Sequence, residues 1–281
     1  VSRGASLLSS GHVSDALVIA ESVADAFPDR AAPLVLAAEC LLKLGRPDEA
    51  ERRALAALRK GARDVRAFIA LAHAYVDQGL HEDAILAMSQ GEEREPQDAT
   101  YWNEYGVLHL KLGNLDHAEV RFRRASILAP GDPAPWVNLA ILSQMRQGPR
   151  AALSFLRRAI DCDPDDGVAW SNYGLALRDA EMVPQAIEAL QRAAELRPHH
   201  AQTRVNLASV LLDDGADLAA ERGFREALAL GPDSVTGRVG LSQALLRKGD
   251  ITSAGDELFE ALRRHPDNAL ARSALGELQL W

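Results

Sequence analysis

One alanine position recurs every 34 residues along the whole chain. The eight alanines that share this spacing are Ala16, Ala50, Ala84, Ala118, Ala152, Ala186, Ala220 and Ala254. A proline follows seven of them by twelve residues, and a glycine precedes six of them by five residues. Three residue types that keep one phase over eight units are not there by chance. A period of about 20–50 residues indicates a repeat architecture, which excludes a chain folded around one central core.

Each unit holds two short helical patterns, as residues 99–132 illustrate. One face of the first predicted helix carries, at positions i, i+3, i+4 and i+7, the residues Trp102, Tyr105, Gly106 and His109. Gly113 is expected to end that helix in the left-handed conformation. The second pattern covers residues 115–128, and Pro130 prevents the helix from continuing. Every unit is therefore predicted to be a helix–turn–helix.

The composition explains how such helices can pack. Alanine supplies 49 of the 281 residues, and aromatic residues are only 5%. Valine, isoleucine and threonine, which favour strands, are sparse. Small residues such as Gly106 and Ala118 let two helices approach closely, while Trp102 and Phe122 fill the wider gaps. One helix pair would still expose an apolar face, so neighbouring pairs must stack into a solenoid.

The repeated residues resemble those of the tetratricopeptide repeat family. The unit that shows this best carries Trp170, Tyr173, Gly174, Leu177, Ala186, Leu190, Ala193 and Pro198. The resemblance implies an all-α, right-handed α-solenoid superhelix. Departures are modest: Arg204 and Arg238 replace the aromatic residue, Gly148 is displaced by one place, and Glu181 replaces a turn glycine.

The phase divides the chain into units of one predicted solenoid domain over residues 1–281. Residues 1–30 form a partial first repeat, and residues 269–281 form a terminal helix. The full repeats between them are predicted at 31–64, 65–98, 99–132, 133–166, 167–200, 201–234 and 235–268.

The inner surface of a stacked solenoid is lined by the first helix of each unit. Positions 4, 7, 8 and 11 of a unit face its second helix, which leaves positions 2, 5, 6, 9, 12 and 13 for the inner face. Three consecutive units carry asparagine at position 6, namely Asn138, Asn172 and Asn206. Asparagine is a poor residue inside a helix because its side chain competes for backbone hydrogen bonds. Since a carboxamide both donates and accepts, each asparagine could hold an extended peptide backbone.

The spacing of the repeats fits this hypothesis. Adjacent helices lie about 8–10 Å apart, and an extended peptide covers about 10 Å in three residues. The arrangement is similar to the asparagine ladder in the repeat superhelix of O-linked N-acetylglucosamine transferases, which implies peptide-backbone binding. The alternative is drift of a duplicated consensus, with asparagines that are only solvated or capping. The other residues expected at the peptide-binding face are Asn103, Val137, Ile141, Leu175, Val205 and Arg178.

Charge and hydropathy disfavour several classes of partner. Lys and Arg total 31 against 40 Asp and Glu, and the net charge of −9 disfavours nucleic acid and anionic membranes. No apolar run reaches the roughly 20 residues that a membrane-spanning helix needs. Chaperone-binding members of the repeat family use a Lys/Asn/Arg clamp for a C-terminal carboxylate. The corresponding positions here hold Asn103, Glu104, Ala134, Val137 and Asn138, without paired cations.

Catalytic and metal sites are not expected. His109 takes the place of a family tyrosine and is expected to pack in the core. The adjacent His199 and His200 offer only two ligands, too few for a specific metal site. The acidic stretch 161–167 resembles the start of a calcium loop, but its glycine falls one place late and Asn172 replaces the closing glutamate. We therefore expect no enzyme activity, no metal and no cofactor.

These patterns predict a non-catalytic scaffold that binds an extended or helical segment of a partner protein in its concave groove. The alternative is the substrate-recruiting region of a larger enzyme, glycosyltransferase-like, or of a multiprotein assembly or secretion machine. The first helix is short, and the chain ends at Leu280 and Trp281 without a polar cap. These ends predict either further chain or self-association through the solenoid ends. A cytoplasmic location is favoured, and a periplasmic one requires that a signal peptide has been removed.

Overall fold

The computed structural model describes residues 2–62, 64–94 and 96–278. These residues form seventeen α-helices and, within the described ranges, no strand. The all-α fold predicted from the repeat is thus confirmed. The predicted uncapped end at Leu280 and Trp281 lies outside the described residues. The helices gather into two compact units, Val1–Pro130 and Gly131–Trp281, and a single solenoid over the whole chain stays a prediction.

The first unit contains helices α1 to α8. Their bounds are α1 Ser2–Ser9, α2 Val13–Ala26, α3 Ala32–Lys43, α4 Pro47–Arg59, α5 Arg66–Asp77, α6 His81–Glu92, α7 Ala99–Lys111 and α8 Leu115–Leu128. The second unit contains helices α9 to α17. Their bounds are α9 Pro133–Gln147, α10 Pro149–Cys162, α11 Gly167–Asp179, α12 Val183–Leu196, α13 Ala201–Asp213, α14 Asp217–Leu230, α15 Val235–Arg247, α16 Ile251–Arg264 and α17 Ala269–Leu278.

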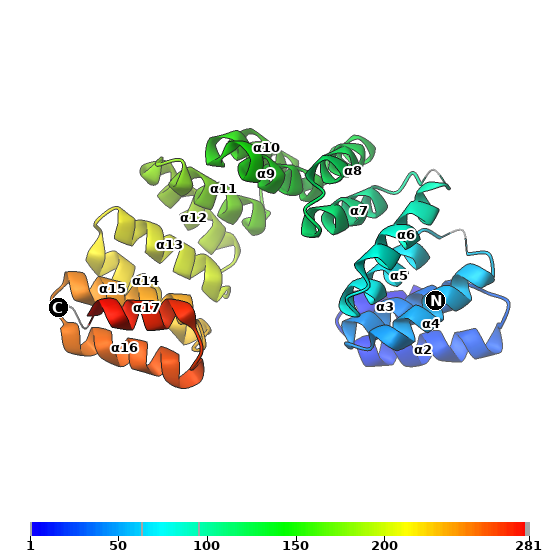
Figure 1. Cartoon of the computed structure of the whole chain (residues 1–281), viewed down its shortest axis with the longest axis horizontal. Helices are drawn as coiled ribbons and strands as arrows, with labels where there is room; N and C mark the ends of the chain where they lie inside the picture. Colours follow the sequence, from blue (N-terminus) through cyan, green and yellow to red (C-terminus); the bar gives the residue numbers. More distant parts are fainter. Residues whose placement is uncertain (1, 63, 95, 279–281) are drawn as a thin grey trace. The chain divides into compact units, whose positions relative to one another are not determined.

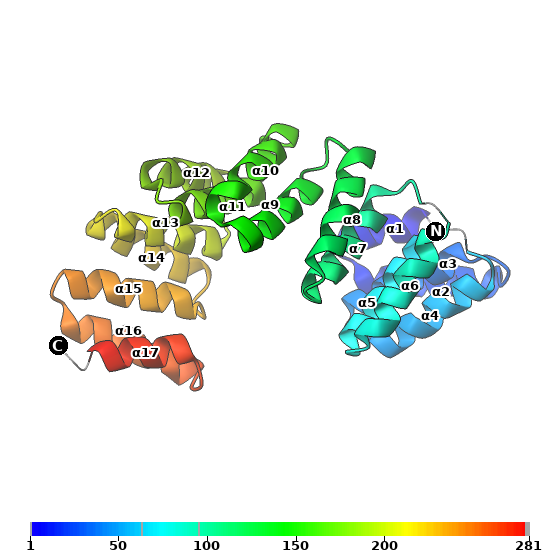
Figure 2. The ribbon, with the colours of Figure 1, turned by 45° about the horizontal axis from the view of Figure 1, so that its top comes forward.

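The helices of each unit stack against one another in chain order (Figures 1 and 2). From α3 onward, each odd helix packs against the even helix that follows it, as α3 does against α4 and α11 against α12. Odd helices of adjacent repeats also contact one another, as α3 with α5, α5 with α7, α9 with α11 and α11 with α13. The odd helices therefore form one continuous face in each unit, and this face carries the positions that the sequence assigns to the inner surface.

The recurring alanine marks the closest contact within each helix pair. All eight alanines of the 34-residue phase are fully buried, at 0% exposure, among them Ala118 and Ala186. The residue at position 8, which faces the second helix, is small in every full repeat, and it is glycine in two of them, Gly106 and Gly174. A Cβ on Gly106 would lie 2.5 Å from a ring carbon of Phe122, and a Cβ on Gly174 would lie 2.6 Å from Leu190. The recurring alanines thus lie buried where the two helices of each repeat pack against each other.

The turn inside each repeat needs a left-handed residue. Gly113 ends α7 with a φ of 75°, as predicted for a left-handed cap. The corresponding residue between α11 and α12 is Glu181, which takes a φ of 64° although it has a side chain. The repeat phase, and not the local residue preference, therefore sets the conformation of this turn.

Acidic caps fix where several odd helices begin. The Asp98 carboxylate accepts hydrogen bonds from the backbone N–H groups of Thr100 and Tyr101 at 2.8 and 3.2 Å. Asp132 and Asp166 cap α9 and α11 in the same way. Asp166, part of the stretch that resembles a calcium loop, is therefore a helix cap. No helix in the described part of the chain is both long and apolar enough to cross a membrane.

Candidate functional site

The three predicted ladder asparagines lie on consecutive odd helices of the second unit. Asn138 is on α9, Asn172 on α11 and Asn206 on α13, and each is half-buried. Since α9 contacts α11 and α11 contacts α13, one carboxamide is contributed by each of three neighbouring helices.

Asn206 is held by its neighbours. Its Nδ2 donates to Ser171 Oγ on α11 at 3.4 Å, and Gln202 Nε2 donates to its Oδ1 at 2.9 Å. Asn172 differs, because its side chain forms no hydrogen bond or ion pair with any residue that the structure describes. The Asn172 carboxamide therefore has its hydrogen-bonding capacity open to a partner.

Apolar side chains lie beside these asparagines. Ile141 on α9 is 40% exposed, and Val137 and Leu175 are half-buried. Val205 is different: it is 3% exposed and packs in a core cluster with Ala208 and Leu212. Its burial leaves it little surface for a partner, since position 5 of this repeat faces the neighbouring helices.

Two other residues predicted for the peptide-binding face are Arg178 and Asn103. Arg178 at the end of α11 pairs with Asp179 at 2.8 Å, and Asp179 also accepts a hydrogen bond from Gln144 at 3.3 Å. Asn103 is half-buried on α7, in the first unit. It therefore lies in a different unit from the three ladder asparagines.

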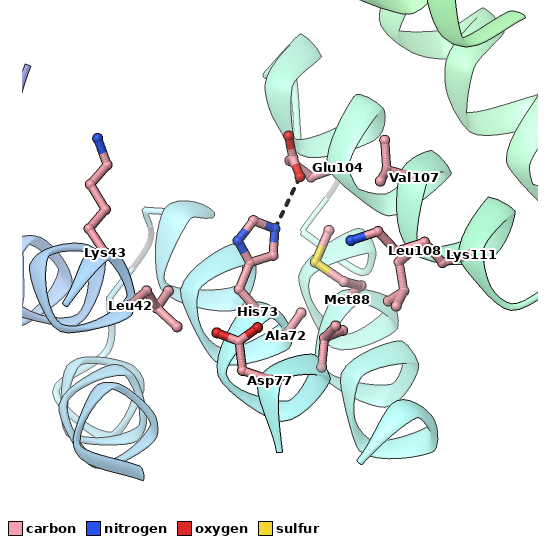
Figure 3. A pocket seen from close by; sticks show the side chains of 11 residues that line it. Leu42, Lys43, Ala72, His73, Asp77, Met88, Glu104, Val107, Leu108 and Lys111 are labelled. Carbon is pink, nitrogen blue, oxygen red and sulfur yellow. Dashed lines mark hydrogen bonds and ion pairs between the residues drawn. The ribbon is translucent and has the colours of Figure 1, made fainter. Parts of the chain in front are cut away.

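The first unit carries a pocket on its odd-helix face. The pocket has a volume of about 310 Å³ (Figure 3). Its apolar lining consists of Leu42, Ala72, Val76, Met88, Val107 and Leu108. Its polar lining consists of Lys43, His73, Asp77, Glu104 and Lys111. We call it the first-unit pocket, and α3, α5 and α7 supply all of its lining except Met88.

One polar contact crosses this pocket between helices. His73 Nε2 on α5 lies 3.0 Å from Glu104 Oε2 on α7 (Figure 3). Lys43, Asp77 and Lys111 are exposed, and none of them forms an ion pair with a described residue. The pocket therefore combines an apolar floor with exposed charged groups that could form ion pairs with a bound partner.

His109 is a packed core residue, as predicted. It is 5% exposed and stacks between Tyr105 and His117, with ring centroids 4.8 and 5.0 Å away. Neither ring nitrogen has a hydrogen-bond partner within the described residues. Burial, with the nearby charges of Arg121 and His117, lowers the pKa of His109 from 6.5 to about 4. A buried imidazole that stays neutral and contacts no cavity has a packing role.

The described residues contain no group of three or more His, Cys, Asp or Glu side chains placed to hold a metal ion.

Comparison with known families decides the identity of this repeat. The family described as the cilia and flagella-associated protein 70 C-terminal domain matches residues 5–221. The chain belongs to this family. A second family, described as tetratricopeptide repeat, matches residues 218–269, so the predicted tetratricopeptide repeat fold is confirmed. No curated protein matches the sequence.

Solved structures show the same repeat fold. Cut9, in the APC/C hetero-tetramer Cut9–Hcn1, gives a TM-score of 0.70 at 23% identity, over 86% of this chain and 48% of that chain. Yeast Tom70 gives 0.69 at 18% identity, over 95% of this chain and 58% of that chain. YrrB, described as a tetratricopeptide repeat protein with an unusual peptide-binding site, gives 0.52 at 20% identity, over 67% and 97%. The chain thus spans about half the length of the first two, and it shares the tetratricopeptide repeat fold with all three.

The tetratricopeptide repeat phase also locates residues of the first-unit pocket, which the sequence did not single out as a binding site. Glu104 occupies position 6 of its repeat, His73 position 9, and Lys43, Asp77 and Lys111 position 13. All are inner-face positions by the rule that selected the asparagines. The second unit differs in that three consecutive repeats carry the same residue, asparagine, at position 6, whereas no residue type recurs in three consecutive repeats among the residues that line the first-unit pocket.

Proposed function

We propose that this tetratricopeptide repeat chain is a non-catalytic scaffold that binds an extended peptide segment along the odd helices of its second unit. The observation that carries the proposal is the open carboxamide of Asn172, which lies between the equivalent Asn138 and Asn206 on the adjacent helices. An amide that offers both a donor and an acceptor matches the alternating N–H and C=O groups of a peptide backbone.

Two further features support an extended peptide as the ligand. Neighbouring odd helices repeat at a spacing that matches about three residues of extended chain. The Ile141 side chain, 40% exposed, and the half-buried Leu175 offer apolar contacts to peptide side chains. Backbone binding by asparagine with apolar side-chain contacts would make the scaffold tolerant of partner sequence and selective for extended conformation.

Asn206 has a second role in this proposal. Because Ser171 and Gln202 hold its carboxamide, its orientation is fixed before a peptide arrives. A preorganised group loses less conformational entropy on binding. Asn206 would then set the register of the peptide, and Asn172 would supply the new hydrogen bonds.

The proposal is tested with peptides selected from a random-sequence display library on the immobilised chain. The triple variant Asn138→Ala, Asn172→Ala and Asn206→Ala should bind the selected peptides at least tenfold more weakly, because two or three hydrogen bonds of about 1 kcal/mol each are lost. Its helicity and melting should stay close to wild type.

The matched control removes carboxamides from an outer helix. Gln185 and Gln191 are exposed on α12, so the pair Gln185→Ala and Gln191→Ala should leave peptide affinity unchanged. Peptide affinity that survives the asparagine triple variant would show that the ladder does not bind the backbone.

A second candidate function is recruitment of a partner to a larger protein. The matching family is described as a C-terminal domain, and the chain spans about half of two solved structures that share its fold. The same inner face would then present a bound substrate or subunit to other regions. Pull-down from cell extract by the full-length gene product, compared with the asparagine triple variant, distinguishes a recruiting role from isolated peptide binding.

A further inference from the structure

The first-unit pocket has charged groups arranged in a row at its rim. Lys43, Asp77 and Lys111 are the last residues of α3, α5 and α7. They occupy the same repeat position on three adjacent odd helices, so their charges alternate as positive, negative and positive. A lysine at a helix C-terminus interacts favourably with the helix dipole, whereas an aspartate there interacts unfavourably with it. Helix stability alone therefore accounts for the two lysines and not for Asp77 between them.

The pocket floor behind this row is apolar. Val107 and Val76 are half-buried, and Met88 is 1% exposed beneath them. Figure 3 shows the Lys111 side chain directed into the pocket and the Lys43 side chain at its opposite side. A volume of about 310 Å³ is at the lower limit of the roughly 300–1,000 Å³ typical of small-molecule sites. It suits one or two side chains better than a larger ligand.

The distance between the lysines determines what kind of ligand could use both. Two helix spacings of about 8–10 Å separate α3 from α7. About six residues of extended chain cover that distance between the two helices. The apolar floor lies between them. The charge pattern therefore fits a segment with an apolar residue in the middle and an acidic residue about three places away on either side.

We propose that the first-unit pocket binds an internal segment of a partner protein, with an aliphatic side chain on the apolar floor and flanking carboxylates at Lys43 and Lys111. Asp77 disfavours a third acidic residue near the centre, because like charges in contact repel. The His73–Glu104 contact joins α5 and α7 at the same pocket. This inference rests on the proposed function only in that the chain binds protein segments, and it uses none of the ladder asparagines.

The probes are three capped peptides, acetylated at one end and amidated at the other, so that terminal carboxylates play no part. Their sequences are Glu-Gly-Ser-Leu-Ser-Gly-Glu, Lys-Gly-Ser-Leu-Ser-Gly-Lys and Glu-Gly-Ser-Ala-Ser-Gly-Glu. Amide resonances of the isotopically labelled full chain are followed by NMR during titration. The acidic leucine peptide should shift resonances around Val76, Val107 and Leu108 and bind at least fivefold more tightly than either of the other two.

Charge reversal provides the sharper test. Lys43→Glu with Lys111→Glu should reverse the preference, so that the lysine-flanked peptide binds more tightly. Both residues are exposed, and Lys43→Gln with Lys111→Gln, which should abolish the preference, serves if the reversed variant melts early. The matched control is Arg59→Glu, an exposed last-turn residue on the outer helix α4, which should keep the wild-type preference.

The outcomes separate this inference from the proposed function. Equal binding of the acidic and lysine-flanked peptides, or a preference that survives charge reversal, overturns the inference. Shifts confined to residues around Asn172 also overturn it while leaving the ladder intact. Pocket shifts that persist in the asparagine triple variant support it independently of the ladder.

Discussion

Asn206 on α13 reaches across to the preceding odd helix, where its Nδ2 donates to Ser171 Oγ at 3.4 Å. Gln202, one turn earlier on α13, donates to the other end of the same carboxamide at 2.9 Å. Asn172, at the equivalent position of the preceding repeat, has no such contacts among the described residues. Two asparagines that look identical in the sequence therefore have different environments.

This difference predicts opposite effects on stability. Asn172→Ala should raise the free energy of unfolding by about 0.5 kcal/mol, because alanine is the better helix former and no internal hydrogen bond is lost. Asn206→Ala gains the same helix propensity but loses two hydrogen bonds, each contributing about 0.5–1.5 kcal/mol, so it should be neutral or destabilising. Urea unfolding followed by circular dichroism measures both. A destabilised Asn172→Ala variant would mean that Asn172 has a structural role.

The close contact between α7 and α8 gives a second prediction. A Cβ on Gly106 would lie 2.5 Å from the Phe122 ring, which is itself fully buried. Gly106→Ala should therefore lower the free energy of unfolding by about 1–3 kcal/mol, as overpacking does. Urea unfolding again provides the measurement, and the additional change Phe122→Leu should recover part of the loss.

A glycine in open space is the control for Gly106. Gly276 lies in α17, and nothing is within 4 Å of a Cβ built on it. Gly276→Ala should therefore stabilise by about 0.5–1 kcal/mol through helix propensity alone. The same sign of effect at both glycines would contradict the packing argument.

The repeat phase was sufficient to predict most of the fold. It placed the four-residue face of α7 correctly: Trp102, Tyr105, Gly106 and His109 are all buried. A strict period fixes which helix side packs, whatever residue occupies the position. Hydrogen bonds between repeats do not follow from the phase, since Asn206 bonds Ser171 only because these two side chains are adjacent in space.

The candidate sites were predicted only in part. Val205 and Val137 share position 5 of their repeats, yet Val205 is buried in the core and Val137 is half-buried. This position lies at the border between the inner face and the neighbouring repeat, so local packing decides its exposure. The first-unit pocket is lined by residues from four helices, α3, α5, α6 and α7, a combination in space that the repeat phase does not mark in the sequence.

The turn between α11 and α12 predicts a stabilising substitution. Glu181 adopts a φ of 64°, in a region that costs an ordinary L-residue about 1 kcal/mol relative to glycine. Glu181→Gly should therefore raise the free energy of unfolding by about 1 kcal/mol. Gly215 has a φ of 81° in the equivalent turn of the next repeat, so Gly215→Ala should lower it. Thermal and urea unfolding of both variants check the pair, and a Glu181→Gly variant of reduced stability would contradict the assignment.

The buried His109 predicts a pH dependence of stability. In the unfolded chain it takes up a proton near its ordinary pKa of 6.5, whereas in the fold the pKa is about 4. Between these values the unfolded state binds more protons, so stability is complete above pH 6.5 and falls as the pH drops toward 4. The loss should be on the order of 1–3 kcal/mol.

Other groups titrate in the same range, so the contribution of His109 requires a variant. His109→Phe keeps an aromatic ring between Tyr105 and His117 and removes the titration. The stability difference between wild type and His109→Phe, from urea unfolding at pH 7.5, 6, 5 and 4, should move steadily in favour of the variant as the pH falls. A difference that stays constant with pH would show that His109 titrates normally in the fold.

The most direct test of the peptide ladder is isothermal titration calorimetry with a display-selected peptide and its singly N-methylated forms. Methylation removes one backbone donor at a time. The ladder predicts that methylation at about every third residue weakens binding roughly fivefold, as expected for one lost hydrogen bond. At the site facing Asn172, the same methylation should cause no further loss once Asn172→Ala is present. Equal affinity for all methylated forms, or full additivity of the two changes, would contradict backbone binding by the asparagines.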